Sequence, residues 1–330
     1  MKALVYTAPE TLMYRYVQDP QPAGGEALVK VDAVGICGSD MHAFLGHDER
    51  RPAPLILGHE VSGTVLSGSH PGQRVTVNPL VTCGQCTACT SGRDNLCPDR
   101  QIISMQPREG GFADQLSMPE RNLVAVPDGY TADQAALAEP IACGWHAVRL
   151  GKAMLTNADD ARTLVIGGGP IGLGAALGLK AQGFEHVLIV EPSALRRSYL
   201  QETCGQKVVA PNELGAKDQF ELIIDGVGIE PSRAQASAHA TPGGVIVHIG
   251  LGSATGGLDI RRLTLQEITF LGTYTYTAQD FRDTAVAMFS GRLGSLNWTK
   301  AMPLSEGQAA FQAIRSGEVA QPKIVLKPNN

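Results

Sequence analysis

Three kinds of segment are missing from this sequence of 330 residues. No apolar run is long enough to cross a bilayer, and the N-terminus has neither the long apolar segment nor the cleavage site of a signal peptide. There is also no basic run, and the net charge is −5, which disfavours nucleic acid and anionic membranes as partners. We therefore expect a cytoplasmic protein whose partner is a small molecule, with no membrane and no nucleic acid involved.

The rest of the composition is ordinary for a globular protein. Hydrophobic residues make up 43% of the chain and charged residues 18%, so disorder is not expected, and the length predicts two domains. Short apolar stretches separated by turns, such as 26–31 and 61–66, predict an all-β fold for the first 130 residues. From 163 to 275, apolar strands alternate with helical segments, which predicts a doubly wound parallel sheet and an α/β protein overall.

Four of the seven cysteines crowd into residues 83–97, with the spacing Cys-x2-Cys-x2-Cys-x7-Cys. They are Cys83, Cys86, Cys89 and Cys97. Four thiolates this close can surround one tetrahedral zinc, and a site closed by four cysteines is structural. The alternatives are accidental pairs, disulfides or an iron–sulfur cluster. Because the spacing differs from that of ferredoxins, we interpret the segment as a structural zinc site.

A second group of metal-binding side chains lies earlier in the chain. Cys37, His59 and Glu60 bring a thiolate, an imidazole and a carboxylate within 24 residues, and these ligands suit a catalytic zinc with one open position. Taken singly, such a cysteine or histidine is more often an ordinary buried residue. Glu139 is a second candidate for the carboxylate ligand, because its apolar context makes burial costly without a cation. It could equally lie at the start of a helix opened by Pro140, so the choice between the two carboxylates stays open.

A glycine-rich turn joins an apolar strand to a helix at the start of the parallel-sheet region. It reads Gly-x-Gly-x-x-Gly, with Gly167, Gly169 and Gly172 as the glycines and with Pro170 and Ile171 between the last two. The first glycine permits a tight turn, the second lets the backbone approach a pyrophosphate, and the third allows close packing of helix on strand. A glycine-rich turn without a ligand is the alternative, but the position between strand and helix favours a dinucleotide site.

The residues after the next strand bear on the choice of cofactor. Glu191 ends that strand, 19 residues beyond Gly172, where an acid accepts hydrogen bonds from the adenosine ribose and repels a 2′-phosphate. We therefore expect NAD. Arg196 and Arg197 lie one helical turn further on and could instead bind the phosphate of NADP. Arg196 stays among the cofactor-binding candidates for this reason.

Taken in order, these motifs resemble those of the zinc-dependent medium-chain dehydrogenases over essentially the whole chain. Glu139 followed by Pro140 is most similar to the polyol branch, which contains the sorbitol and threonine dehydrogenases. The resemblance implies two zinc ions per chain, one catalytic and one structural, and a homodimer or homotetramer. It further implies a GroES-like catalytic domain made of 1–140 and 285–330, with the zinc lobe at 83–97, and a Rossmann NAD-binding domain at 141–284.

The resemblance also implies roles for single residues. Ser39 and His42 match a relay that carries the substrate proton from a hydroxyl to a surface imidazole. Asp40 matches a carboxylate that holds His59 in the correct tautomer. Read from local sequence alone, Ser39 and Asp40 could simply be turn residues. Phe112 matches a position that lines the substrate pocket, and Glu60 is a ligand that some relatives exchange with water during turnover.

The sequence departs from the sorbitol dehydrogenase pattern near the substrate. That pattern has an Arg-Tyr pair where this chain has Thr275 and Tyr276, so Tyr276 remains a substrate candidate while sorbitol itself is in doubt. The loop 47–51 is unusually charged, and Arg50 or Arg51 could pair with a carboxylate, sulfonate or phosphate of the substrate. A solvated loop is the more ordinary interpretation.

We therefore expect an oxidoreductase that moves a hydride between NAD and a secondary alcohol of a small polyol or related hydroxy compound. An NADP-linked aldehyde or ketone reductase with the same zinc site is one alternative. A non-catalytic, zinc-stabilised nucleotide-binding protein is another. The complete set of candidate ligands and relay residues argues against the last, because an idle site has no physical need for all of them.

Overall fold

The computed structural model describes residues 1–328, which form two compact units. Unit 1 comprises Met1–Glu139, Thr277–Phe289 and Thr299–Asn330, of which residues 329 and 330 lie outside the described part. Unit 2 comprises Pro140–Tyr276 and Ser290–Trp298.

The units differ from the expected domains on their C-terminal side. The expected boundary between 284 and 285 falls inside the helix α9 (Ala278–Phe289), which lies wholly in unit 1. The chain then returns to unit 2 for Ser290–Trp298 before it finishes in unit 1. No sequence pattern marks this short return, because its contacts are made with distant segments.

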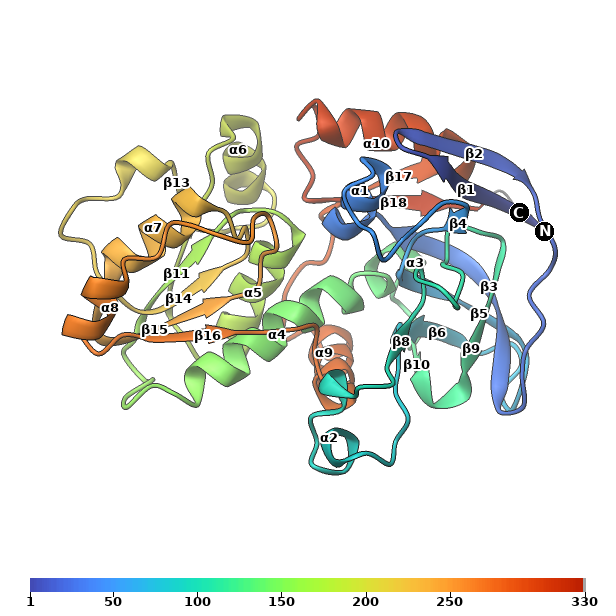
Figure 1. The fold of residues 1–330 in the computed structure, drawn as a ribbon, viewed down its shortest axis with the longest axis horizontal. Helices are drawn as coiled ribbons and strands as arrows, with labels where there is room; N and C mark the ends of the chain where they lie inside the picture. The colour runs from blue at the N-terminus through green and yellow to red at the C-terminus, as the bar shows by residue number, and fades with distance from the viewer. Residues whose placement is uncertain (329–330) are drawn as a thin grey trace. The chain divides into compact units, whose positions relative to one another are not determined.

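Unit 1 is built mainly from antiparallel strands (Figure 1). Its largest sheet has seven strands in the order β10-β6-β5-β3-β18-β17, with β9 also paired to β3, and smaller sheets have the orders β2-β1-β4 and β7-β8. The strands are β1 (Lys2–Ala8), β2 (Thr11–Tyr16), β3 (Glu26–Gly35), β4 (Leu55–Ile56), β5 (Glu60–Ser67), β6 (Arg74–Val77), β7 (Leu80–Val81), β8 (Gln101–Ile102), β9 (Gln115–Pro119), β10 (Leu123–Ala125), β17 (Thr299–Pro303) and β18 (Lys323–Lys327). The helices and 3₁₀ turns are α1 (Gly38–Phe44), α2 (Thr87–Thr90), η1 (Asp94–Leu96), η2 (Glu120–Asn122), α3 (Ala132–Ala135), α9, η4 (Leu304–Glu306) and α10 (Gly307–Arg315).

The long strand β3 is central to this sheet. Its residues alternate between buried and half-buried, as expected where side chains point to opposite faces. Val325 of β18 pairs with Gly35 of β3, so the last strand joins unit 1. The core beside the sheet contains the rings of Phe44, Phe112 and Phe311, all fully buried.

Unit 2 contains a six-stranded parallel sheet with the order β13-β12-β11-β14-β15-β16 (Figure 1). The strands are β11 (Arg162–Ile166), β12 (His186–Val190), β13 (Val208–Val209), β14 (Phe220–Asp225), β15 (Ala240–His248) and β16 (Thr269–Gly272). The helices and turn are α4 (Ala138–Lys152), α5 (Pro170–Ala181), α6 (Ala194–Glu202), η3 (Pro211–Glu213), α7 (Glu230–His239) and α8 (Ile260–Leu265). The strand order reverses at β11, and doubly wound sheets bind nucleotides at such a switch point.

Two helices, α3 and α4, follow each other between residues 132 and 152. Thr131 and Gln134 exchange the hydrogen bonds of a capping box around α3, which ends at Ala135. The second helix, α4, has Pro140 in its first turn, where a missing N–H leaves no helical hydrogen bond unmade. Among the described residues, no helix has both the length and the apolar composition needed to cross a membrane.

Candidate active site and metal centres

Cys37, His59 and Glu60 meet in unit 1. Cys37 caps the N-terminus of α1, and Glu60 is the first residue of β5, directly after His59. One ligand atom from each lies within 4.8 Å of those of the other two. Gly58 precedes them with φ +90, and a Cβ there would stand 2.5 Å from the ring of Phe112. Glycine is therefore required at the bend that brings the histidine to the cysteine.

The carboxylate of Glu60 is fully buried, and its two oxygens have different surroundings. Oε1 accepts a hydrogen bond of 2.5 Å from Nζ of Lys323, whereas Oε2 has no protein partner. A Cβ on Gly35, its partner across the sheet, would lie 1.9 Å from Oε2, so only glycine leaves room for this oxygen. A buried, unpaired carboxylate oxygen next to a thiol and an imidazole is the arrangement that a bound cation would satisfy. These residues therefore fit zinc.

Glu139 does not join this group of ligand atoms in the described structure. It lies in the first turn of α4 and is 4% exposed. Burial lowers the pKa of Lys323, but the negative charges of Glu60, Cys37 and Glu139 raise it, and the balance lies above the ordinary value. The charge of Glu139 thus acts on Lys323, while a carboxylate oxygen of Glu60 lies among the atoms that could bind a metal.

His59 is oriented by two groups at Nδ1. Oγ of Ser104 lies 3.2 Å from this nitrogen, and Oδ1 of Asp40 lies 3.5 Å from it. The Asp40 carboxylate also accepts hydrogen bonds from the backbone N–H of Cys37 and of Gly58. Burial raises the pKa of Asp40, but His59, the charge of Arg51 and the N–H of Cys37 lower it, and the pKa falls below its ordinary value. With Nδ1 occupied, Nε2 is the nitrogen left to bind a metal.

The proposed relay residues lie on α1. Ser39 is half-buried in the first turn, next to Asp40, and His42 is exposed near the end of the helix. An exposed imidazole can exchange protons with solvent. Their spacing of three residues puts them on one side of the helix.

The four cysteines 83, 86, 89 and 97 form the second group with metal-binding geometry. Sγ of Cys89 lies 3.5 Å from Sγ of Cys86 and 3.9 Å from Sγ of Cys83. All cysteines in the described structure are free of disulfides. The helix α2 and the turn η1 shape this lobe, which extends away from the main sheet of unit 1 (Figure 1). Asp94 of η1 accepts hydrogen bonds from N–H of Ala278 and so joins the lobe to the start of α9.

The glycine fingerprint in unit 2 connects β11 to α5. Gly167 has φ +96, and a Cβ on Gly172 would stand 1.7 Å from the carbonyl oxygen of Gly167, so both positions require glycine. Gly169 caps α5, and a Cβ there would meet nothing within 4 Å. The helix N-terminus, with Pro170 in its first turn, is thus open to an anion such as a pyrophosphate.

Glu191 follows β12 and contacts the fingerprint. One carboxylate oxygen accepts from N–H of Gly168 at 2.8 Å, and the other accepts from N–H of Ser193 at 2.8 Å. Arg197 donates to the backbone carbonyls of Glu191 and Pro192, so its guanidinium stabilises the loop. Burial lowers the pKa of Arg196, and the charge of Glu191 opposes this shift.

Most of the side chains predicted to bind substrate make contacts within the protein instead. Arg50 forms two hydrogen bonds with Asp48, and Arg51 is 2% exposed and pairs with the same carboxylate at 2.5 Å. The interpretation of Arg51 as a partner for an anionic substrate was therefore wrong, because its guanidinium is buried. Phe112 has no exposed surface and packs edge-on against Phe311, so it belongs to the core. Tyr276 is 1% exposed, at the end of the first segment of unit 2.

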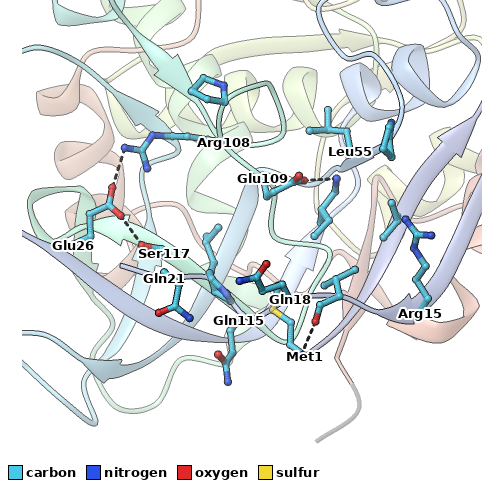
Figure 2. Close-up of a pocket in the computed structure, with 18 residues that line it drawn as sticks. Met1, Arg15, Gln18, Gln21, Glu26, Leu55, Arg108, Glu109, Gln115 and Ser117 are labelled. Carbon is cyan, nitrogen blue, oxygen red and sulfur yellow. Dashed lines mark hydrogen bonds and ion pairs between the residues drawn. The ribbon is translucent and has the colours of Figure 1, made fainter. Parts of the chain in front are cut away.

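A separate pocket of about 430 Å³ lies in unit 1 (Figure 2). Its wall includes Arg108, which pairs with Glu26 at 2.9 Å, and Glu109, which accepts from N–H of Ile56. None of the metal-binding residues lines it. This pocket is therefore not the reaction site.

Sequence reasoning missed two residues of the metal centre and misread a third. Lys323 lies most of the chain length away from Cys37 and Glu60 in the sequence. The only signal for its burial was its position in a short apolar strand. Ser104 gave no signal, because neighbouring residues do not reveal its approach to His59. Arg51 was noticed, but as a loop residue and not as a buried one.

Comparisons with known proteins agree with this architecture. The family model of the alcohol dehydrogenase GroES-like domain matches residues 23–128, and that of the zinc-binding dehydrogenase matches residues 170–291. L-galactonate-5-dehydrogenase of Escherichia coli (strain K12) is 32% identical, with 89% of this chain and 88% of the relative aligned. Sorbitol dehydrogenase of Ovis aries is 31% identical over 96% of this chain and 93% of the relative.

Solved structures give the same result for the fold. Acetophenone reductase from Geotrichum candidum NBRC 4597, solved in complex with NAD, has a TM-score of 0.87 at 26% identity. The match covers 99% of this chain and 96% of the other. A GroES-like unit that carries a cysteine, histidine and glutamate centre, joined to a Rossmann-type unit, accounts for both comparisons. The chain therefore belongs to the zinc-dependent medium-chain dehydrogenases, in their polyol dehydrogenase branch, whose members oxidise and reduce secondary alcohols.

Proposed function

We propose that this protein moves a hydride between NAD and the secondary alcohol of a small polyol or related hydroxy compound. Cys37, His59 and Glu60 hold the catalytic zinc. The observation that carries the proposal is the buried Oε2 of Glu60, which has no protein partner and lies beside a thiol and an imidazole. A second, structural zinc belongs in the lobe of four cysteines, where no position is left open for substrate.

Zinc at the first site supplies Lewis-acid chemistry, which makes a substrate hydroxyl more acidic. The chain must then remove a proton. The hydroxyl of Ser39, two residues after Cys37, takes up this proton as it gives its own to the cofactor ribose, and the exposed imidazole of His42 accepts the proton that the ribose hydroxyl gives up in turn and exchanges it with solvent. Asp40, buried beside His59, keeps the metal-binding imidazole in place.

The cofactor is NAD. The open N-terminus of α5 at Gly169 receives the pyrophosphate, because a helix N-terminus favours anions and glycine lets the backbone approach closely. Glu191, held at the fingerprint by Gly168 and Ser193, offers its carboxylate to the ribose hydroxyls and repels a 2′-phosphate.

The substrate carries adjacent hydroxyl groups, as polyols and sugar acids do. This choice follows the relatives named L-galactonate-5-dehydrogenase and sorbitol dehydrogenase. We further propose that the protein is a cytoplasmic homodimer or homotetramer. Sedimentation analysis of the purified protein, together with cell fractionation, tests both points.

The test is absorbance at 340 nm with NAD or NADP against a panel of polyols, sugar acids and simple secondary alcohols, using protein whose zinc has been counted. We expect two zinc ions per chain and turnover of one polyol or sugar-acid class with NAD. Cys37→Ser should abolish turnover and remove one zinc, while the cysteine lobe keeps the other. A wild-type protein with only the lobe zinc, or turnover that survives Cys37→Ser, would overturn the proposal.

A further inference from the structure

Ser104 adopts a backbone conformation that suits glycine. Its φ is +69, in the left-handed region, and its side chain is fully buried. A residue other than glycine is strained there, and such strain persists only where the surroundings hold it. The question is what a serine provides here that glycine would not.

The hydroxyl of Ser104 is the difference. Its Oγ lies 3.2 Å from Nδ1 of His59, closer than the 3.5 Å from Oδ1 of Asp40 to the same nitrogen. That oxygen of Asp40 already accepts the N–H of Gly58 at 3.1 Å, and the other accepts the N–H of Cys37. Asp40 thus also holds the backbone around the ligands, and the serine is the nearer of the two partners of the imidazole.

The position of Ser104 is fixed in turn by a buried cation. Nε of Arg51 donates to the carbonyl oxygen of Ser104 at 3.0 Å, and Nη1 of Arg51 pairs with Asp48 at 2.5 Å. Arg51 is 2% exposed, so it has left water for these contacts. The rigid guanidinium thus links the Ser104 carbonyl, held by Nε, to the Asp48 carboxylate, held by Nη1. The charged loop 47–51 is therefore linked to the metal centre through the contact of Arg51 with the backbone of Ser104.

We propose that Ser104 is a positioning residue for the metal. Its hydroxyl accepts the Nδ1–H of His59, which fixes the ring orientation and the tautomer that leaves Nε2 for zinc, and Arg51 anchors the serine. Partners of this kind typically change metal affinity by about 10–100-fold when removed. The inference rests on the proposed zinc site at Cys37, His59 and Glu60.

The test uses two substitutions that share the loss of the hydroxyl but differ in strain. Ser104→Ala keeps a Cβ at positive φ, whereas Ser104→Gly relieves it. Ser237→Ala, which removes another buried hydroxyl in unit 2, is the matched control. Three quantities are measured: zinc per chain, the rate of zinc loss to excess chelator, and the thermal midpoint. The absorption bands of Co²⁺-substituted protein report the geometry of the bound metal.

We expect both Ser104 variants to lose one zinc at least about tenfold faster than the wild type, and to shift the Co²⁺ bands. The lobe zinc and Ser237→Ala should behave as in the wild type. Ser104→Gly should have the higher thermal midpoint of the two variants and still lose its zinc as fast as Ser104→Ala. Wild-type rates and spectra in both variants would overturn this inference alone. A wild-type protein that binds only the lobe zinc would instead overturn the proposed function.

Discussion

Nζ of Lys323 lies 2.5 Å from Oε1 of Glu60, and neither side chain has any exposed surface. The same ammonium group donates to the carbonyl oxygen of Ile36 at 2.7 Å. Cys37 and Glu139 also lie close enough to this ammonium group for their negative charges to raise the pKa of Lys323 together with Glu60.

Lys323→Met should destabilise the metal-free protein strongly, because it leaves Glu60 buried without its cation. Removing one partner of a buried pair costs about 3–5 kcal/mol of unfolding free energy. Bound zinc should reduce this loss by supplying the missing positive charge. Urea unfolding of metal-free and zinc-loaded protein measures both values.

The control for this experiment is Lys327→Met on the same strand. Lys327 is 37% exposed and pairs with Asp133, so its loss should cost at most about 1 kcal/mol. Equal losses in the two variants would show that Lys323 contributes no more than a surface lysine.

Glu60→Gln and Glu139→Gln form a matched pair that identifies the carboxylate ligand. Glu60 lies with Cys37 and His59 in the group of ligand atoms, and Glu139 does not. We expect Glu60→Gln to retain one zinc per chain and Glu139→Gln to retain two, because a neutral amide is a poor zinc ligand. Metal analysis after dialysis gives the count. The reverse pattern would assign the ligand to Glu139.

Glu191→Gln should weaken the preference for NAD over NADP while keeping the shape of the side chain. The amide can still meet the ribose, but it no longer repels a 2′-phosphate. A hydrogen bond to a charged group contributes about 1.5–3 kcal/mol, so the Kd for NAD should rise about 10–100-fold. Fluorescence titration with both cofactors measures this change. An unaltered ratio of the two affinities would point to Arg196 and Arg197 as the determinants.

Asp48→Asn should lower stability at neutral pH and matter less in acid. Burial raises the pKa of Asp48, but hydrogen bonds from Arg50 and the charges of Arg50 and Arg51 bring it down to about 2. A pKa lowered by folding adds stability that is complete above about pH 4 and is lost as the pH falls toward 2. Allowing for solvent screening, we expect a difference of about 1–2 kcal/mol at pH 7 and a smaller one at pH 3. Denaturant unfolding at the two pH values tests this, and a constant difference would rule out the ionised pair as its source.

The parts that could be predicted from sequence are those whose chemistry is local. The glycines 167, 169 and 172 and the four lobe cysteines lie within short segments, so their spacing alone indicates the ligand. Cys37 and His59 required only one strand pairing to meet. By contrast, the contact between Lys323 and Glu60 joins residues 263 positions apart, and no local pattern encodes it.

Other errors arose where one sequence pattern was compatible with two different structural roles. The charged run at 47–51 suggested a solvated loop or a substrate contact, yet Arg51 folds inward because a backbone carbonyl and a carboxylate satisfy its guanidinium. The family resemblance placed Phe112 at the substrate pocket, but its ring fills the space beside Gly58. Ser104 owes its position to a backbone conformation with positive φ, and a serine in the sequence does not predict that conformation.

The separation of Lys323 from Glu60 has a consequence for biosynthesis. The lobe of four cysteines is complete once residue 97 has been made, so it can acquire its zinc while the chain is still on the ribosome. The other centre cannot: until β18 is synthesised and paired with β3, Glu60 lacks its counter-ion and the thiol and imidazole sit in an unfinished sheet. We therefore expect that the lobe is able to bind metal earlier than the other centre, which is complete only in the finished fold.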